Sequence, residues 1–166
     1  LAHGRLVGGQ AGADFLLSLK EETLWVAAEV ASTPVLIPGQ PGDMNSLIRA
    51  MRTMLESGRT FFADPILDPI HFGFAESIVR FVDLRRSFPE VPIMMGVGNV
   101  TELTDADTAG INAVLMGLIS ELRIGALLTT EVSPHARRAV READVARRMM
   151  FASRTDKSLP RGYTDD

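Results

Sequence analysis

With 166 residues, of which 46% are hydrophobic and 23% are charged, the chain is long enough for one globular domain with a sizeable core. Its net charge of −4 gives no reason to expect nucleic acid as a partner, and the absence of cysteine excludes disulfides and thiolate chemistry. No signal peptide is visible, and no apolar run reaches the ~18 residues that a membrane-spanning helix needs. We therefore expect a cytoplasmic protein without a membrane partner.

Buried strands and amphipathic helices alternate along the chain. Short apolar runs predict strands at 13–19, 34–38, 61–63, 92–99 (with an exit loop) and 125–131. Apolar side chains at helical spacing predict helices at 21–31, 44–55 (with Asp43 as the N-cap), 76–88, from Thr104 to about residue 122, and from Ser133 to about residue 153. On the 76–88 helix, Arg80 is expected to point largely outward. Residues 1–12 are weakly patterned, and residues 156–166 are expected to form a polar, loose tail.

This alternation predicts parallel β/α units with right-handed crossovers, in one domain over residues 1–155. The strands begin at intervals of 20 to 33 residues, which suits a βα repeat. Five such units cannot close a (β/α)8 barrel, because that fold needs eight. Composition and periodicity therefore leave two α/β folds open, a five-stranded doubly wound sheet and the later part of a barrel.

The leading candidate site lies at the end of the third strand, in the run TFFADPILDP at residues 60–69. Pro65 cannot donate a ladder hydrogen bond and disfavours helical angles at Asp64, so the strand ends at Asp64. Barrels and open α/β sheets bind their ligands at the carboxyl ends of their strands. The alternative is that Asp64 and Asp68 only cap the turn that follows the strand.

A metal site is not expected. His71 follows Asp68 by three residues, which is a spacing that metal ligands can use. The only other histidines are His3 and His135, and no cysteine or second nearby histidine completes a ligand set.

A dinucleotide-binding site is not indicated either. The pair Gly96 and Gly98 lacks the third glycine of a dinucleotide-binding fingerprint.

Two stretches of the chain resemble motifs of the pterin-binding barrels. The run DPIHFGF at 68–74 and the strand PIMMGVGN at 92–99 are similar to motifs of the dihydropteroate synthases. The run DPILDP at 64–69 and the turn Gly98-Asn99-Val100 are similar to motifs of the folate-dependent methyltransferases in the same superfamily.

Over about residues 10–155, the chain looks most like the dihydropteroate synthase-related proteins of organisms that make tetrahydromethanopterin. The stretches that carry this likeness are GADFLLSL at 12–19, GVGNVTELTDAD at 96–107 and LTTEVSPHARR at 128–138. The resemblance implies that the five strands are the fourth to eighth of a TIM (β/α)8 barrel. The first three strands, and the loop that grips the pyrophosphate of the pterin substrate, would then be missing from this sequence.

The resemblance implies a site that holds a reduced pterin as substrate or ligand. A buried carboxylate can accept adjacent donors of the pterin edge, and an amide can donate and accept beside it, which suits Asp64 and Asn99. Asp68 competes with Asp64 for this role, because the two family motifs align to different acids. Further rim residues and candidate substrate or anion contacts are Ser18, Thr129, Thr130, Glu131, His135 and Arg137.

The reaction that the resemblance implies is the condensation of a reduced pterin with an arylamine, in tetrahydromethanopterin or folate-type biosynthesis. No cofactor is firmly implied, and Mg²⁺ would enter only with the pyrophosphate of the substrate. The lysine of the synthases is absent and their Arg-x-His is replaced by Thr129-Thr130-Glu131, so retention of the synthase reaction stays open.

The alternative functions are a pterin-dependent methyltransferase, which would act with a corrinoid protein, and a non-catalytic pterin-binding domain. An incomplete barrel leaves strand edges and apolar helix faces uncovered. We therefore expect the chain to form a homo-oligomer or to bind its missing N-terminal half.

Overall fold

A computed structural model describes residues 2–163 of the chain, which divide into two compact units. The first unit takes in the chain up to Ile66 together with Glu76–Met94. The second unit takes in Leu67–Ala75 and the chain from Met95 onward.

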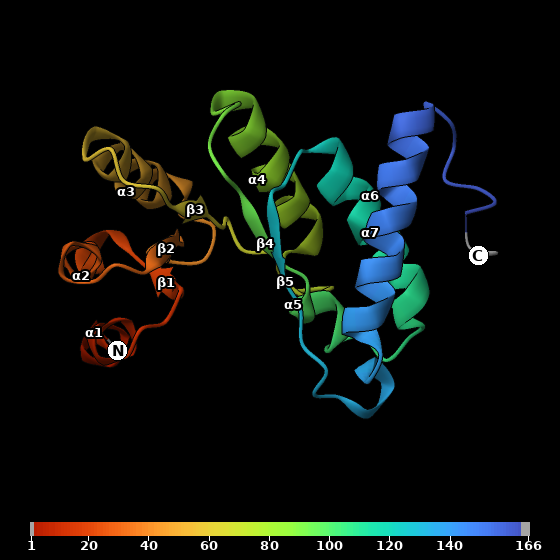
Figure 1. The fold of residues 1–166 in the computed structure, drawn as a ribbon, viewed down its shortest axis with the longest axis horizontal. Helices are drawn as coiled ribbons and strands as arrows, with labels where there is room; N and C mark the ends of the chain where they lie inside the picture. The colour runs from red at the N-terminus through yellow and green to blue at the C-terminus, as the bar shows by residue number, and fades with distance from the viewer. Residues whose placement is uncertain (1, 164–166) are drawn as a thin grey trace. The chain divides into compact units, whose positions relative to one another are not determined.

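The first unit is built on a parallel three-stranded sheet in the order β1-β2-β3 (Figure 1). Its elements are α1 (Ala2–Gln10), β1 (Phe15–Leu19), the 3-10 turn η1 (Glu21–Thr23), α2 (Trp25–Glu29), β2 (Thr33–Leu36), α3 (Met44–Glu56), β3 (Phe62–Ala63) and most of α4 (Phe74–Ser87). Phe15 pairs with Thr33 and Val35 pairs with Phe62, while a parallel bridge joins Ala63 to Ile93. The expectation of parallel β/α units is confirmed for these strands.

The second unit has a two-stranded sheet of β4 (Met94–Gly96) and β5 (Ala126–Leu128). Its helices are α5 (Gly98–Thr101), α6 (Thr108–Glu121), the 3-10 turn η2 (Pro134–Ala136) and α7 (Ala139–Asp156). Helices α6 and α7 lie side by side and pack against each other (Figure 1). The carboxyl ends of β4 and β5 lead into α5 and η2, so the candidate residues that follow these two strands belong to this unit.

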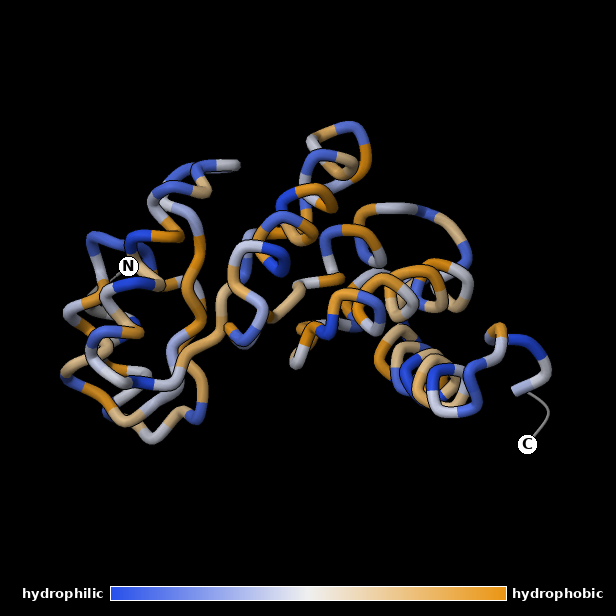
Figure 2. Tube along the Cα trace, turned by 90° about the horizontal axis from the view of Figure 1, so that it is seen from above, coloured by the Kyte–Doolittle hydropathy of each residue, from blue (hydrophilic) through white to orange (hydrophobic). Residues whose placement is uncertain are grey.

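Each unit has its own apolar core. In the first unit Leu19, Leu36 and Phe81 have no exposed surface, and in the second Met95 and Val97 have none. Apolar and polar residues alternate along the helices, which is the pattern of helices that bury one side (Figure 2). The predicted α3 face is confirmed at its centre, where Leu47 and Met51 are fully buried.

The structure differs from the predicted elements in four details. The weakly patterned residues 1–12 contain helix α1, and the helix expected at 21–31 is broken into η1 and α2 around Leu24. The N-cap of α6 is Asp107 rather than Thr104, because the Asp107 carboxylate accepts from the Ala109 and Gly110 amides at 3.1 and 3.2 Å. The helix expected from Ser133 begins as η2 and becomes α-helical only at Ala139.

The predicted tail at 156–166 extends past Tyr163, where the described residues end. Within its described part, the Tyr163 hydroxyl donates to the Asp156 carboxylate at 2.9 Å. Across residues 2–163, no helix combines the length and the apolar character needed to cross a membrane.

Candidate functional site

In the first unit, Asp64 directly follows β3, at the carboxyl end of the strand as the sequence predicts. Its amide donates to the Leu36 carbonyl at 2.8 Å, and its carboxylate accepts from the Ile66 amide at 2.8 Å. The carboxylate thus closes a short turn over its own backbone. Burial raises the pKa of Asp64 to about 6, with the Ile66 amide only partly opposing it. Asp64 can therefore accept hydrogen bonds or exchange a proton near neutral pH.

The turn that presents Asp64 holds Ile66 in a costly backbone conformation. Ile66 has φ of 65°, a left-handed angle that costs a β-branched residue on the order of 1–3 kcal/mol. Arg80 on α4 steadies the turn, since its guanidinium donates to the Pro65 carbonyl at 3.3 Å and to the Ile66 carbonyl at 2.9 Å. The prediction that Arg80 points outward is therefore wrong, because these carbonyls draw its side chain into a half-buried position.

Ser18 lies at an irregularity near the end of β1. Leu16 pairs with Pro34 and Leu19 pairs with Leu36, so β1 holds one residue more than β2 over this stretch. Ser18 takes up the irregularity with φ of 63° and is half-buried. Such bulges often re-aim side chains beside ligand sites.

Lys20 is a residue of this strand end that the sequence analysis missed. It follows β1 and its ammonium donates to the Gly39 carbonyl at 2.7 Å. The Gly39 amide in turn donates to the Ser46 hydroxyl at 2.8 Å. Lys20 therefore links the ends of β1 and β2 and places a positive charge at the same sheet edge as Asp64.

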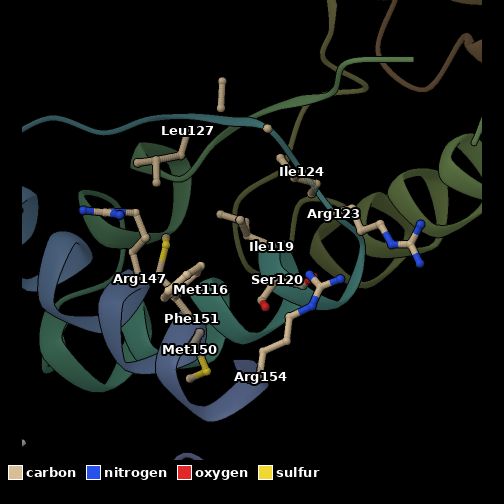
Figure 3. A pocket seen from close by; sticks show the side chains of 12 residues that line it. Met116, Ile119, Ser120, Arg123, Ile124, Leu127, Arg147, Met150, Phe151 and Arg154 are labelled. Carbon is tan, nitrogen blue, oxygen red and sulfur yellow. The ribbon is translucent and has the colours of Figure 1, made fainter. Parts of the chain in front are cut away.

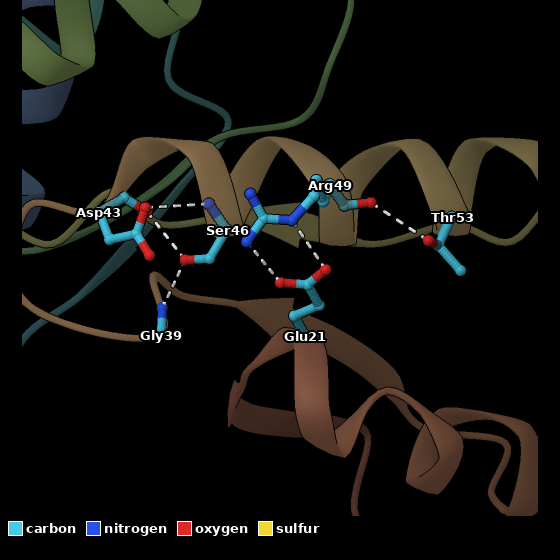
Figure 4. A network of polar contacts seen from close by, with 6 residues as sticks. All are labelled: Glu21, Gly39, Asp43, Ser46, Arg49 and Thr53. Carbon is cyan, nitrogen blue, oxygen red and sulfur yellow. Dashed lines mark hydrogen bonds and ion pairs between the residues drawn. The ribbon is translucent and has the colours of Figure 1, made fainter.

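A polar network fixes the loop between β2 and α3 (Figure 4). Asp43 caps α3 as predicted, by accepting from the Ser46 amide at 3.2 Å. Arg49 on α3 makes two hydrogen bonds of 2.9 and 2.8 Å to the Glu21 carboxylate, and these bonds and the nearby charge lower the pKa of Glu21. The loops around this strand end are therefore held by side chains as well as by the sheet.

In the second unit, the structure brings Asn99 to the loop of Asp68. Asn99 lies in α5 just after β4, and its amide group donates to the Leu67 carbonyl at 2.8 Å. Asp68 packs against the backbone of its own loop, since a Cβ added at Gly73 would lie 3.0 Å from its carboxylate oxygen. Asp68 thus belongs to the same unit as Asn99, whereas Asp64 and Ser18 belong to the first unit.

Glu102 organises the loop after β5 and was not singled out from the sequence. Its carboxylate accepts from the Val132 and Ser133 amides at 2.9 and 2.7 Å and from the Thr130 hydroxyl at 2.8 Å. These bonds, led by the one from Val132, lower the pKa of Glu102 to about 2. The hydroxyl of Thr130, a predicted rim residue, is therefore engaged in holding the loop.

The two other predicted residues of the last strand differ in their surroundings. Glu131 accepts a hydrogen bond of 3.0 Å from the Val140 amide and so satisfies a donor at the start of α7. Thr129 has a buried hydroxyl oxygen without a partner among the described residues. An unpaired buried hydroxyl is uncommon and marks Thr129 as a group that a ligand or water can satisfy.

His135 borders an open hollow of about 470 Å³ that is also lined by Glu102, Leu103, Asp105, Ser133 and Pro134. One ring nitrogen lies 3.1 Å from the Thr101 carbonyl and the other lies 3.6 Å from the Asp105 carboxylate. Because the carbonyl can only accept, His135 carries a proton on the nitrogen that faces Thr101. Arg137 is exposed just after η2.

Among residues 2–163, no group of three or more histidine, aspartate or glutamate side chains could hold a metal ion. His71 is exposed on the loop after Asp68, with a left-handed φ of 68°.

Comparisons with known proteins give one relative of part of the chain. The chain is similar to the uncharacterized protein MJ0107 of Methanocaldococcus jannaschii, with 35% identity over 128 residues. The match covers 74% of the chain and 24% of that protein, so the chain spans about a quarter of the length of this relative. No family model matches the chain, and no solved structure matches it.

Proposed function

We propose that the chain is part of a pterin-binding protein of the dihydropteroate synthase type, in which it supplies the later five strands of a TIM barrel. The observation that carries the proposal is the environment of Asp64. An acceptor carboxylate stands at the carboxyl end of a parallel strand, is largely desolvated, and is fixed by the Ile66 turn that Arg80 steadies. A pocket that reads the donor edge of a pterin needs such a group.

The chemistry of the site residues supports the same ligand. A pterin presents adjacent N–H donors and ring acceptors along one edge. Asp64, in the first unit, supplies two acceptor oxygens for the donors of this edge. Asn99, in the second unit, carries an amide that can both donate and accept, and its contact with the same ligand stays a prediction from the sequence. Thr129 offers a hydroxyl that lacks a partner within the described part of the chain. The pterin is the ligand in this assignment, and Mg²⁺ would accompany only the pyrophosphate of a substrate.

In the proposed reaction, the nitrogen of an arylamine attacks the carbon that bears the pyrophosphate. A C–N bond forms, the C–O bond to pyrophosphate breaks, and the amine gives up one proton. The protein positions the two reactants and stabilises the charge of the leaving group. This transferase activity belongs to the whole protein.

A second candidate is a non-catalytic pterin-binding domain or a pterin-dependent methyltransferase. The engagement of Glu131 favours it, because this side chain binds the Val140 amide at the position where the Arg-x-His of the synthases has its histidine. Binding and condensation must therefore be measured separately.

Calorimetric titration of a reduced pterin tests the binding step, with the whole polypeptide used wherever it extends beyond these residues. Asp64→Asn should weaken binding by about 1.5–3 kcal/mol, or roughly 10- to 100-fold, because a donor replaces an acceptor at the pterin edge. Asp83→Asn is the matched control, since Asp83 is an exposed acid on α4. Equal affinity of wild type and Asp64→Asn would remove Asp64 from the site, and a larger loss in Asp68→Asn would give the role to Asp68.

Release of pyrophosphate with a reduced pterin pyrophosphate and an arylamine tests the reaction. Amine-dependent release supports the synthase. Tight pterin binding without release supports the second candidate.

A further inference from the structure

A cavity of about 220 Å³ lies in the second unit at the amino end of β5, between the strand and the facing sides of α6 and α7 (Figure 3). Its walls are mainly apolar and include Met116, Ile119, Leu127, Met150 and Phe151. The hollow beside His135 follows the carboxyl end of β5, so the two depressions lie at opposite ends of this strand. The cavity is therefore separate from the candidate residues of the second unit.

The rim of this cavity is basic. Three arginines, Arg123, Arg147 and Arg154, line it, and no acidic residue lies among the described residues that line it. This arrangement stands out in a chain whose net charge is −4. An anion is thus favoured over a cation at this mouth.

Arg154 is the arginine best placed to meet an anion. It donates to the Ser120 carbonyl at 3.1 Å, which holds the guanidinium beside Ser120 at the cavity (Figure 3). Within residues 2–163, no carboxylate pairs with Arg154. Arg147 differs, because it forms an ion pair with Asp144, which also pairs with Arg148. Arg154 therefore keeps its charge and most of its donors available.

The apolar walls call for a ligand with an apolar body. Phe151 has 71% of its surface exposed at the rim, while Met116 at the floor is 1% exposed. The cavity, with a volume of about 220 Å³, is partly open to solvent and has room for a small ligand. An apolar body would leave water for these walls, and an anionic head would meet Arg154.

We propose that this cavity binds a small amphipathic organic anion, with its carboxylate or similar head on Arg154 and its apolar body against Met116, Leu127 and Phe151. The proposal does not depend on the pterin assignment, because it uses different residues at the other end of β5.

The test compares octanoate with 1-octanol, which share an eight-carbon chain and differ in charge. Both are titrated into the ¹⁵N-labelled protein, and amide shifts at Leu127, Met150 and Phe151 report binding at the cavity. We expect octanoate to bind about tenfold more tightly than octanol, which corresponds to one charge-assisted hydrogen bond at an exposed arginine.

Two matched variants identify the charge responsible. Arg154→Gln should abolish the preference for octanoate while leaving octanol binding unchanged. Arg148→Gln, on the same helix but away from the cavity, should leave the preference intact. Retained backbone spectra show that both variants are folded.

Equal affinities for octanoate and octanol would overturn the proposal, as would equal effects of the two variants or shifts confined to other residues. A second copy of the chain is the other possible occupant of the cavity. Light scattering at each protein concentration shows whether the chain self-associates. Octanoate binding that disappears as the protein self-associates would assign the surface to a second copy of the chain and would also overturn the proposal.

Discussion

At the residue scale, the protonation of Asp64 is linked to the stability of the fold. Burial raises the pKa of Asp64 from an ordinary value of 3.8 to about 6. The folded state therefore holds the proton more tightly than the unfolded state, and stability falls as pH rises from about 4 through about 6. The shift of roughly two pKa units corresponds to at most about 3 kcal/mol.

We predict that Asp64→Asn removes this part of the pH dependence. The variant keeps an oxygen that can accept from the Ile66 amide, and it cannot ionise. Urea unfolding should show the variant gaining stability over wild type between pH 4 and pH 7.5, by up to about 3 kcal/mol. Asp83→Asn should show no such gain. If the difference in unfolding free energy between wild type and Asp64→Asn stayed constant with pH, it would contradict the raised pKa of Asp64.

Glu102 gives a prediction of the opposite sign. Its folded pKa is lowered to about 2 from 4.5, so the stability that it contributes is present above about pH 4.5 and is lost as pH falls toward 2. The Val132 and Ser133 amide protons point at its carboxylate, so their NMR shifts should titrate with a midpoint of about 2.

Glu102→Gln should remove that titration and speed hydrogen exchange at the Val132 and Ser133 amides. Glu121→Gln, which changes an exposed acid on α6, should do neither. A midpoint close to 4.5 would mean that the Glu102 contacts do not form in solution.

The contrast between Asp64 and Glu102 shows which site residues could be predicted from the sequence. The position of Asp64 followed from Pro65, because a proline ends a buried strand through local sterics. Glu102 and Lys20 gave no such signal, since the backbone groups that they bind lie 30 to 31 and 19 residues away in the chain. Long-range contacts with the backbone leave no pattern in side-chain types.

At the element scale, two neighbouring glycines of α1 should respond in opposite ways to the same substitution. A Cβ at Gly9 would lie 2.5 Å from a methyl carbon of Val30 and 2.7 Å from its Cβ, so α1 would have to move. A Cβ at Gly8 would meet nothing within 4 Å.

We predict that Gly9→Ala destabilises the chain by about 1–3 kcal/mol, through overpacking against Val30. Gly8→Ala should instead stabilise it by up to about 1 kcal/mol, because alanine favours the helix over glycine. Thermal or urea unfolding of both variants measures the difference. If Gly9→Ala were as stable as wild type or more stable, α1 would not pack closely on Val30 in solution.

The same contact explains why the sequence did not reveal α1. Glycines lower helix propensity, and the pattern of apolar residues in 1–12 is weak. In the folded chain α1 approaches Val30 so closely that only glycine fits at position 9. Helix α3 was predictable because its N-cap Asp43 and its buried residues Leu47 and Met51 all lie within the helix or next to it.

At the scale of the whole molecule, periodicity could establish β/α units but not how many strands the sheet needs. A doubly wound sheet and a barrel share the same strands, helices and crossovers. They differ in what lies beside the first and last strand, which is information that this stretch of sequence does not hold.

The strands are also shorter than predicted. A strand ends where the neighbouring strand no longer supplies hydrogen-bond partners, so β5 covers Ala126–Leu128 rather than residues 125–131.

The edge strands lead to a prediction about assembly. β1 has β2 as its neighbour and β5 has β4, so within the described strands each is hydrogen-bonded on one side. Both carry exposed apolar side chains, with Leu17 at 41% and Leu128 at 44% exposure. If the chain supplies five strands of a barrel, both strands need a neighbour from outside it. Uncovered strand edges of this kind favour association.

We therefore predict that the chain self-associates, and that the double variant Leu17→Lys and Leu128→Lys is monomeric. A lysine on an edge strand opposes pairing through its charge and its hydration. Val79→Lys is the control, because Val79 is also apolar and exposed, at 55%, but lies on helix α4. Light scattering over a range of concentrations measures the mass of each form. If the wild-type chain stays monomeric throughout, its strand edges need no partner, and the independent doubly wound sheet is favoured over the barrel.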